Sequence, residues 1–333
     1  MATRVIVVGA GPIGLGVARE VGARPSLELS AVVDVDPKKV GTEVEGVPVT
    51  SSLPAVDPHG PPTVAALTTT SSLAKLEPLV LDVIARGMHV VSTCEELAWP
   101  WRPHAPESDE RGRERDAIAH RIDNAARARG VCVLGTGVNP GFLMDALPLA
   151  LTAPCRRVER VRAERVQDAS ARRRPFQDKV GVGMAPDTVT QGLHARILGH
   201  VGLEESARMI AARLGLDIDA FVEDMKPVVT DIDVEAHGRT VRAGETIGVE
   251  QVGRASKGGA LVVELFFRAT FGQHNARDRI VVEGDPPLDV VIQGGVPGDV
   301  ATCAIVANAI PVLLVARPGL RTMADVPLVV WAR

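Results

Sequence analysis

Two adjacent glutamates, Glu95 and Glu96, are the residues of this 333-residue sequence whose type and position most directly suggest chemistry. They follow the apolar segment 88–93, and Trp99 and Trp101 come shortly after them. A carboxyl group in an apolar pocket has a raised pKa and can then exchange a proton near neutral pH. A structural alternative stays open, in which one glutamate helps to cap a helix and the tryptophans are ordinary core residues.

A glycine-rich turn near the start of the chain has the spacing of a phosphate-binding loop. Residues 5–8 are apolar and predict a strand buried on both faces, and three glycines then follow as G-x-G-x-x-G. Such glycines permit a tight turn, close approach of the backbone to a pyrophosphate, and close packing of helix on strand. Free N–H groups at the start of the next helix favour the phosphate charge. The residues predicted to bind a nicotinamide dinucleotide here are Gly9, Gly11, Pro12, Ile13 and Gly14.

The end of the second predicted strand, residues 29–34, indicates which dinucleotide binds. Asp34 lies 20 residues past Gly14 (34 − 14 = 20), where an acidic side chain can accept both hydroxyls of the adenosine ribose. Its charge would repel a 2′-phosphate, so the sequence favours NAD. Lys38 and Lys39 follow and could bind such a phosphate, although a solvated helix start explains them better. NADP therefore stays open.

Other strand ends are expected at the same edge of the sheet, because the carboxyl ends of strands in an open α/β sheet face the cofactor crevice. The buried segment 63–67 runs into a hydroxyl-rich stretch, which could equally cap the helix that begins near residue 73. The segment 131–135 runs into a turn rich in Gly and Pro at 136–142. The further residues predicted to contact the cofactor are Thr69, Thr70, Ser71, Thr93 and Asn139.

The order of elements predicts an α/β fold with two domains. Residues 1–150 alternate buried strands with helices, which is typical of a Rossmann dinucleotide-binding domain. Residues 151–298 predict an α+β domain on a mostly antiparallel sheet. The strands predicted there are 158–166, 228–234, 240–249, 260–270, 279–283 and 289–292, and the helices are 188–198 and 204–214. Residues 299–333 predict a helix, capped by Asp299, and a tail that return to the first domain.

Composition narrows the class of protein. The chain is 46% hydrophobic with a formal net charge of −4, so no basic excess indicates a nucleic-acid partner. The chain enters a strand almost at once, and the longest apolar run, 305–316, is too short to span a bilayer, so we expect a cytoplasmic protein without membrane contact. The four scattered cysteines predict neither metal nor disulfide. The absence of tyrosine excludes a Tyr–Lys proton-donor pair.

Several motifs together resemble the 2,4-diaminopentanoate dehydrogenases, a family that includes the native NAD(P)-dependent amine dehydrogenases. The most specific are Cys94-Glu95-Glu96-Leu97 and the segment 136–142, Thr-Gly-Val-Asn-Pro-Gly-Phe. The segments 168–170, 175–177, 200–203 and 294–299 fit the same pattern. The resemblance covers nearly the whole chain except the charged stretch after Arg102. Residues 104–115 are expected to be a mobile surface insertion, followed by an amphipathic helix over 113–129. The resemblance implies a fold similar to dihydrodipicolinate reductase.

This resemblance also implies a reaction, the reversible oxidative deamination of a primary amine on a secondary carbon to a ketone and ammonia. The family's catalytic glutamate falls within the pair, with Glu96 as the first choice and Glu95 as the second. Its carboxylate would take a proton from the ammonium and stabilise the iminium by charge. The residues predicted to line the substrate pocket are Trp99, Trp101, Phe142, Phe176 and His200.

Other functions stay open at this point. A diamino acid substrate would need a cation for its carboxylate, and Arg162, Arg165, residues 172–174 and Lys179 are available. Two tryptophans and no tyrosine favour small aliphatic amines instead. An ammonia-independent imine or carbonyl reductase and a dinucleotide-binding regulator without chemistry are the rival functions. A homodimer is expected through the exposed sheet of the second domain.

Overall fold

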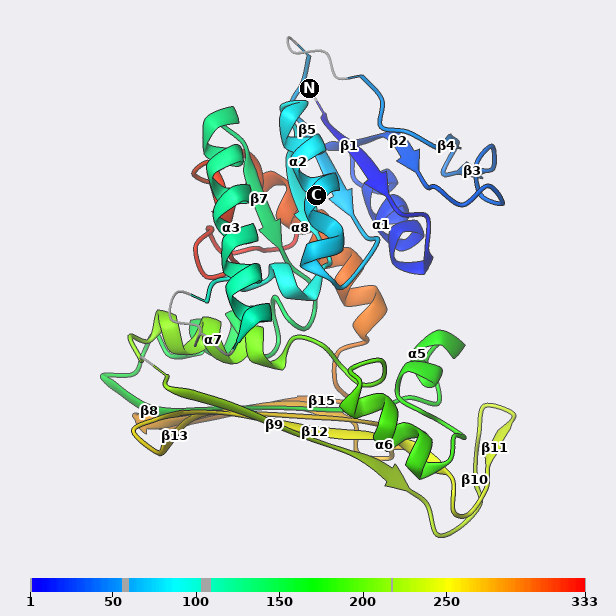
Figure 1. Ribbon diagram of the computed structural model, residues 1–333, viewed down its shortest axis with the longest axis vertical. Coiled ribbons are helices and arrows are strands. Elements are labelled where there is room, and N and C mark those ends of the chain that lie inside the picture. Colours follow the sequence, from blue (N-terminus) through cyan, green and yellow to red (C-terminus); the bar gives the residue numbers. More distant parts are fainter. Residues whose placement is uncertain (1, 56–59, 103–108, 217, 333) are drawn as a thin grey trace. The chain divides into compact units, whose positions relative to one another are not determined.

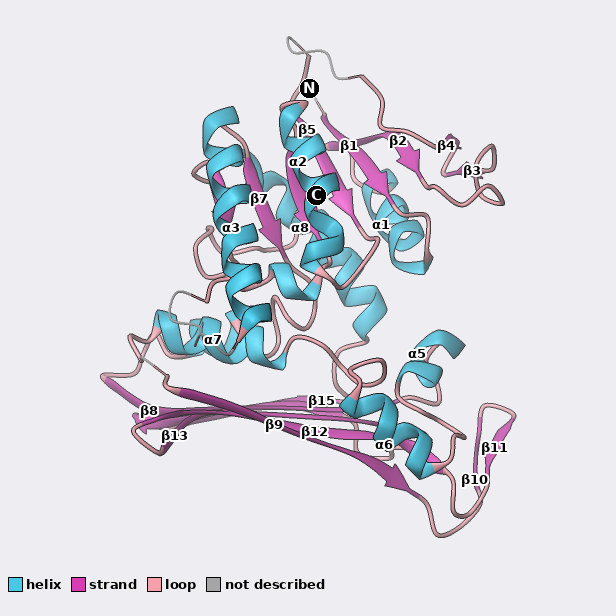
Figure 2. Cartoon of the chain, in the orientation of Figure 1, coloured by secondary structure: helices cyan, strands magenta, loops and turns pink. Residues whose placement is uncertain are grey.

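The computed structural model describes residues 2–55, 60–102, 109–216 and 218–332. The chain forms two compact units, each visible in Figures 1 and 2. The first unit comprises Met1–Phe142 and Pro297–Arg333, and the second comprises Leu143–Val296. The chain therefore passes from one unit to the other after Phe142 and returns after Val296.

The first unit contains an eight-stranded sheet in the order β16-β7-β6-β5-β1-β2-β4-β3. Its neighbouring strands are parallel except the short pair β3 and β4. The strands are β1 Thr3–Val8, β2 Leu27–Val33, β3 Glu43–Val44, β4 Val47–Thr50, β5 Thr63–Leu67, β6 His89–Ser92, β7 Cys132–Gly135 and β16 Gly319–Arg321. The strand order reverses between β1 and β5. A doubly wound sheet binds its ligand outside the carboxyl ends of the strands at this point.

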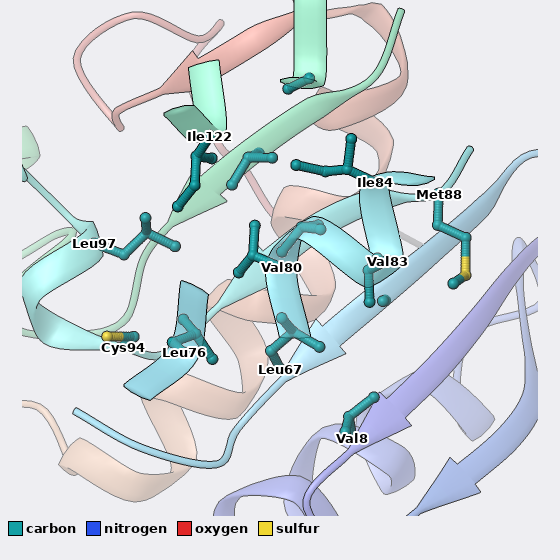
Figure 3. Close-up of a cluster of buried hydrophobic side chains, with 14 of the residues drawn as sticks. Val8, Leu67, Leu76, Val80, Val83, Ile84, Met88, Cys94, Leu97 and Ile122 are labelled. Atoms are coloured by element: carbon teal, nitrogen blue, oxygen red, sulfur yellow. The ribbon is translucent and has the colours of Figure 1, made fainter. Parts of the chain in front are cut away.

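Helices cover this sheet because its strands are apolar on both sides. They are α1 Pro12–Gly22, α2 Leu73–Ala85, α3 Glu110–Arg129 and α8 Gly298–Val315, with the 3₁₀ turn η1 at Glu95–Leu97. Helix α2 packs against α3, and α1 packs against α8. Figure 3 shows the core between α2, α3 and the strands, where Leu67, Leu76 and Val80 are fully buried. Fully burying a side chain of this size stabilises the fold by roughly 1.5–3 kcal/mol.

Helix α8 is long and apolar enough to span a membrane, with 18 residues and a mean hydropathy of 1.9. It packs against α1, β6 and β7, so we interpret it as a core helix of the first unit. A Cβ atom at Gly16 of α1 would lie 2.4 Å from the Sγ of Cys303, which shows how closely the two helices approach.

The second unit contains a six-stranded sheet in the order β15-β14-β8-β13-β12-β9, in which only β8 and β13 are parallel neighbours among the described strands. The strands are β8 Arg157–Asp168, β9 Ala220–Val229, β12 Thr246–Lys257, β13 Ala260–Thr270, β14 Arg277–Asp285 and β15 Leu288–Gln293, with a small hairpin of β10 Val234–Ala236 and β11 Arg239–Val241. The helices are α4 Ala146–Leu151, α5 Arg174–Lys179, α6 Pro186–His194 and α7 Leu203–Arg213. The predicted fold class is confirmed in both units.

Some predicted element boundaries are wrong. The strand predicted at 228–234 is two strands, because the Thr230 hydroxyl donates to the carbonyl of Ile232 at 2.7 Å and closes a turn. The strand predicted at 240–249 is interrupted by a turn at Gly244, whose φ of +86° suits glycine. Helix α8 begins after Pro297, so Asp299 lies in its first turn and does not cap it.

The helix predicted at 113–129 begins earlier, at Glu110, so the second half of the predicted insertion 104–115 is helical. Residues 103–108 lie outside the described part of the chain. From Glu110 onward the stretch forms the first turns of α3, which Asp109 caps by accepting the N–H of Gly112 at 2.8 Å. The charged side chains of this region are therefore held on a helix that packs against α2, β7 and β16 and contacts η1 through Arg111.

Candidate active site

The glycine loop after β1 has the geometry of a dinucleotide cradle. Gly9 has a φ of +99°, and a Cβ atom at Gly14 would lie only 1.7 Å from the carbonyl oxygen of Gly9. At Gly11 a Cβ atom would meet no atom within 4 Å, so the chain leaves open space where a phosphate would approach. Pro12 and Ile13 begin α1, whose first N–H groups lack helical partners and suit an anion. The loop therefore fits a pyrophosphate.

Thr68 joins this loop to the end of β5, a contact that the sequence analysis missed. Its hydroxyl lies 2.9 Å from the carbonyl oxygen of Gly9 and 3.1 Å from that of Val8. The predicted residues Thr69, Thr70 and Ser71 come next, and the Thr70 hydroxyl accepts the N–H of Ser72 at 3.2 Å just before α2. The hydroxyl-rich stretch thus shapes the turn at the switch point of the sheet.

Asp34 lies directly after β2, and its carboxylate is held by backbone N–H groups. Oδ2 accepts the N–H of Ala10 at 2.7 Å, and Oδ1 accepts that of Asp36 at 2.9 Å. Lys39 forms an ion pair with Oδ2 at 2.9 Å. Burial alone would raise the pKa of Asp34, but these hydrogen bonds and the Lys39 charge lower it below its usual value. The carboxylate is therefore charged and lies beside the glycine loop.

Of the two lysines that follow, Lys39 contacts Asp34, whereas the predicted cofactor residue Lys38 is exposed. The backbone N–H of Lys38 donates to Asp36 Oδ1 at 3.0 Å. The Lys38 side chain thus lies on the surface two residues beyond Asp36.

Glu96, in the η1 turn after β6, is a buried carboxylate with partners on two helices. Oε2 accepts the N–H of Leu73, the first residue of α2, at 2.7 Å. Oε1 forms an ion pair with Arg111 in the first turn of α3. The carboxylate is 6% exposed. Arg111 was not among the predicted residues, because nothing in the sequence indicates that the charged stretch folds back on η1.

Glu95 precedes it in the same turn and is half-buried. Burial, and to a lesser degree the charge of Glu95, raises the pKa of the neighbouring Cys94 thiol. Cys94 is therefore a poor nucleophile. Trp99 is half-buried as well. Trp101 packs at the edge of the hydrophobic core and meets the His120 ring of α3 edge-on at 5.4 Å. These contacts favour the alternative in which this tryptophan is an ordinary core residue.

The turn after β7 completes this edge of the sheet. The Val138 N–H donates to the Thr302 hydroxyl of α8 at 3.2 Å, and a Cβ atom at Gly141 would lie 2.5 Å from the Gly137 nitrogen. Asn139 and Phe142 belong to this turn, and Thr93 follows β6, its N–H donating to Leu67 of β5 at 3.1 Å. The predicted residues of the first unit thus lie on loops at the carboxyl ends of neighbouring strands.

The two remaining predicted pocket residues, Phe176 and His200, belong to the second unit. The guanidinium of Arg172 lies 4.0 Å from the centre of the Phe176 ring. His200 stacks on Phe267 at 4.7 Å between ring centres. Burial, followed by the nearby charges of Lys179 and Arg165, lowers the pKa of His200 to about 3, so its ring is neutral near pH 7. Within the described residues there is no group of three acidic, His or Cys side chains that could hold a metal ion.

Comparison with known proteins adds independent evidence. Residues 142–332 match the model of the 2,4-diaminopentanoate dehydrogenase C-terminal domain, and residues 1–91 match that of the CoA binding domain. The 2,4-diaminopentanoate dehydrogenase of Acetoanaerobium sticklandii is 30% identical, over 98% of this chain and 93% of its own. An amine dehydrogenase of Streptomyces virginiae is 25% identical, over 97% and 96%. The solved amine dehydrogenase from Mycobacterium smegmatis shares the fold, with a TM-score of 0.78 at 18% identity over 99% of this chain and 97% of that chain.

Proposed function

Because the chain belongs to the 2,4-diaminopentanoate dehydrogenase family, we propose that it interconverts a primary amine on a secondary carbon with the corresponding ketone and ammonia. It is an oxidoreductase with a Rossmann-type dinucleotide-binding unit and amine-dehydrogenase relatives. The observation that carries the proposal is the glutamate pair at the end of β6, on the same sheet edge as the glycine loop. A carboxylate at that edge can take a proton from a substrate beside a bound dinucleotide.

The proposal assigns the dinucleotide to the loops after β1, β2 and β5. Gly9, Gly11 and Gly14 would receive the pyrophosphate, and Asp34 the ribose hydroxyls. The bound nicotinamide supplies the hydride acceptor. NAD is the preferred form, because the Asp34 carboxylate is held facing the glycine loop by Ala10 and would repel a 2′-phosphate. Lys39 offsets part of that charge, so use of NADP is expected to be weaker but measurable.

Glu95 is the catalytic carboxylate in this proposal, which reverses the order inferred from the sequence. Both oxygens of Glu96 bind other parts of the first unit, Leu73 and Arg111, in a site almost closed to solvent. A general base must reach the proton that it removes. Glu95 lies in the same turn, is more exposed, and is therefore the better placed member of the pair.

The residues of this chain then act in a simple order. The Glu95 carboxylate pairs with the substrate ammonium and takes one proton, which leaves a neutral amine. Loss of hydride from the carbon gives an iminium ion, whose positive charge the nearby carboxylates stabilise. Water adds to the iminium carbon, and proton transfer followed by C–N cleavage releases ammonia and leaves the ketone. In the reductive direction the same steps run backwards.

Small aliphatic amines are the preferred substrates, as the tryptophans beside the glutamates suggest. A diamino acid is the second candidate, and one observation favours it. Lys179 places positive charge near the neutral ring of His200 in the second unit, and such charge suits a carboxylate, whereas the nearby Arg165 is already paired with Asp278 at 3.0 Å. Trp101 supports the first candidate less than the sequence suggested, because its ring packs against His120. Phe142 and Trp99 of the first unit remain the proposed apolar lining, and Phe176 of the second unit stays a prediction.

We further propose a cytoplasmic homodimer without nucleic-acid or membrane contact. One face of the second sheet carries alternating charges, such as Arg162 and Arg268 beside Glu264 and Glu250, which two copies could share about a twofold axis. Sedimentation of the pure protein should give a dimer, and Glu264→Lys should weaken it. A monomeric wild-type protein at micromolar concentration would contradict the proposed assembly.

The first test is oxidation of NADH and of NADPH with a small ketone, with and without ammonium. The expected result is loss of reduced cofactor only with ammonium, and faster with NADH. Turnover without ammonium would instead identify a carbonyl reductase. If small ketones fail, 2,4-diaminopentanoate with NAD tests the second candidate, and failure of both with tight cofactor binding would indicate a regulator.

The second test separates the glutamates. Glu95→Gln should lower kcat about 10²- to 10⁴-fold and remove the rise of activity with pH, because the general base is lost. Glu96→Gln should lower kcat less and keep that rise. The opposite ranking of the two variants would assign the base to Glu96.

A further inference from the structure

The first turns of α3 form a series of contacts with residues 94–102, which we call the glutamate turn. Arg111 pairs with the Glu96 carboxylate, and the Arg115 guanidinium lies 3.5 Å from the Glu96 carbonyl oxygen. The next residue of α3, Asp116, accepts the N–H of Arg102 through Oδ1 at 2.7 Å. Positions four residues apart share a helix face, so one side of α3 lies along the glutamate turn.

The glutamate turn is also fixed from within. The Arg102 guanidinium donates to the carbonyl oxygens of Trp99 and Trp101 at 3.1 and 3.0 Å. Beneath it, a Cβ atom at Gly135 of β7 would lie 2.5 Å from the carbonyl carbon of Leu97. The backbone that carries Glu95 is therefore packed against β7 on one side and bonded to α3 on another.

Glu96 connects this arrangement to the start of α2. Its Oε2 binds the Leu73 N–H, at the end of the hydroxyl-rich stretch that follows β5. A buried carboxylate is costly without a cation, and losing one partner of a buried pair is strongly destabilising. Arg111 reaches this buried carboxylate from the protein surface, where its own side chain is 58% exposed. The ion pair thus holds two loops of the proposed cofactor edge through a single carboxylate.

We propose that Arg111 is a positioning residue for the reaction, acting through Glu96. It neutralises the buried carboxylate, which in turn fixes both the glutamate turn and the start of α2. Without Arg111, Glu96 would be drawn toward solvent, and Glu95 and the stretch before Leu73 would lose their orientation. This inference rests on the proposed function for its catalytic consequence, but not for the ordering of the two loops.

The test compares Arg111→Gln with Arg121→Gln as a matched control. Arg121 also links α3 to α2, through Glu77 at 2.6 and 3.0 Å, but it lies away from the glutamate turn. Arg111→Gln should lower kcat about ten- to a hundredfold, as expected for a misplaced reacting group, with KM for the amine changed far less. Arg111→Lys should restore most of the activity, and Arg121→Gln should leave kcat unchanged.

A double-mutant cycle shows whether Arg111 acts through Glu96. Arg111→Gln combined with Glu96→Gln should be no slower than the slower single variant, because both substitutions break the same contact. Multiplied effects would overturn the proposal, since Arg111 would then act independently of Glu96.

Hydrogen exchange gives a readout that needs no turnover. In Arg111→Gln, amide exchange should be at least about tenfold faster in segments 94–101 and 72–76 than in the wild type, and unchanged in Arg121→Gln. A fall in kcat without faster exchange, or faster exchange without a fall in kcat, overturns the proposal. If the wild-type protein turns over no amine, the proposed function fails, and the exchange comparison alone decides whether Arg111 orders the two loops.

Discussion

In the first unit the acidic side chains near the proposed cofactor site lie at the carboxyl ends of buried strands. The acidic side chains of the second sheet lie along its strands. Asp34 and Glu96 each accept a backbone N–H of another element and each pair with one cation. Glu264 and Glu250, on the second sheet, form ion pairs with arginine and lysine side chains of neighbouring strands. The same residue types are therefore held by backbone in one sheet and by side chains in the other.

This difference follows from how each sheet is covered. Helices bury both faces of the parallel sheet, so charged groups find room only where its strands end. The second sheet leaves one face to carry charged residues in alternation with buried ones, as the pattern of β8 shows. Geometry set by backbone N–H groups is more exact than geometry set by long flexible side chains. Carboxylates held in place by backbone N–H groups therefore occur at the strand ends of the first sheet.

One pair in the second unit breaks this pattern. Arg165 and Asp278 are 2% and 3% exposed, and their Nη1 and Oδ1 atoms are 3.0 Å apart. Arg165 also donates to the carbonyl oxygen of Val296 at 2.9 Å, and Asp278 accepts the N–H of Val296 at 2.8 Å. The pair therefore anchors the last residue of the second unit.

The largest predicted effect is loss of this buried pair. Asp278→Ala should lower the free energy of unfolding by about 3–5 kcal/mol, because it leaves the Arg165 charge buried and frees the Val296 N–H. Urea unfolding followed by circular dichroism measures the change. A loss below about 1 kcal/mol would show that the pair behaves like a surface contact.

A second prediction concerns the glycine loop. Gly14→Ala should cost about 1–3 kcal/mol of stability, as overpacking does, because the new Cβ atom cannot stay 1.7 Å from the Gly9 carbonyl oxygen. NADH binding, measured by fluorescence titration, should weaken at least about tenfold as the loop shifts. Gly11→Ala, where a Cβ atom meets nothing, should keep wild-type stability and lose only affinity. Equal stability losses in both variants would contradict this description of the loop.

A third prediction tests the strand-end carboxylate Asp34. Asp34→Asn should weaken discrimination against NADPH, by about tenfold in the ratio of kcat/KM values, since the repulsive charge is gone. Its pH dependence has a definite sign. The folded pKa lies below the unfolded value, so the stabilisation is present above about pH 4 and is lost as pH falls through the folded pKa. The difference in unfolding free energy between wild type and Asp34→Asn should therefore be constant from pH 5 to 7 and vanish in acid.

The smallest predicted effect is on the exposed face of the second sheet. Asp289 binds the Arg279 guanidinium through both carboxylate oxygens, at 2.8 and 2.6 Å, and this contact raises the Arg279 pKa. Solvent and salt screen such a pair, so Asp289→Asn should not shift the urea midpoint measurably at 0.15 M salt. A loss comparable to that of Asp278→Ala would show that burial does not separate the two kinds of carboxylate.

Local patterns were enough to predict the parts of the site that depend on spacing. The glycines after β1, Asp34 at the end of β2 and the glutamates after β6 each follow a buried apolar run, so their place at strand ends could be inferred. Thr68 lay one residue before the predicted stretch. Its role was missed because a hydroxyl that bonds the carbonyl of Gly9 depends on how β1 and β5 pair.

The sequence by itself determined the class of fold and the family motifs, because apolar periodicity and glycine spacing are local properties of the chain. Only the tertiary structure decided which glutamate is buried. Glu96 points to the start of α2 and to Arg111, residues 23 and 15 positions away, and no local pattern encodes that meeting. Contacts between distant segments arise from the packing of whole elements, and they distinguish two chemically identical neighbours such as Glu95 and Glu96.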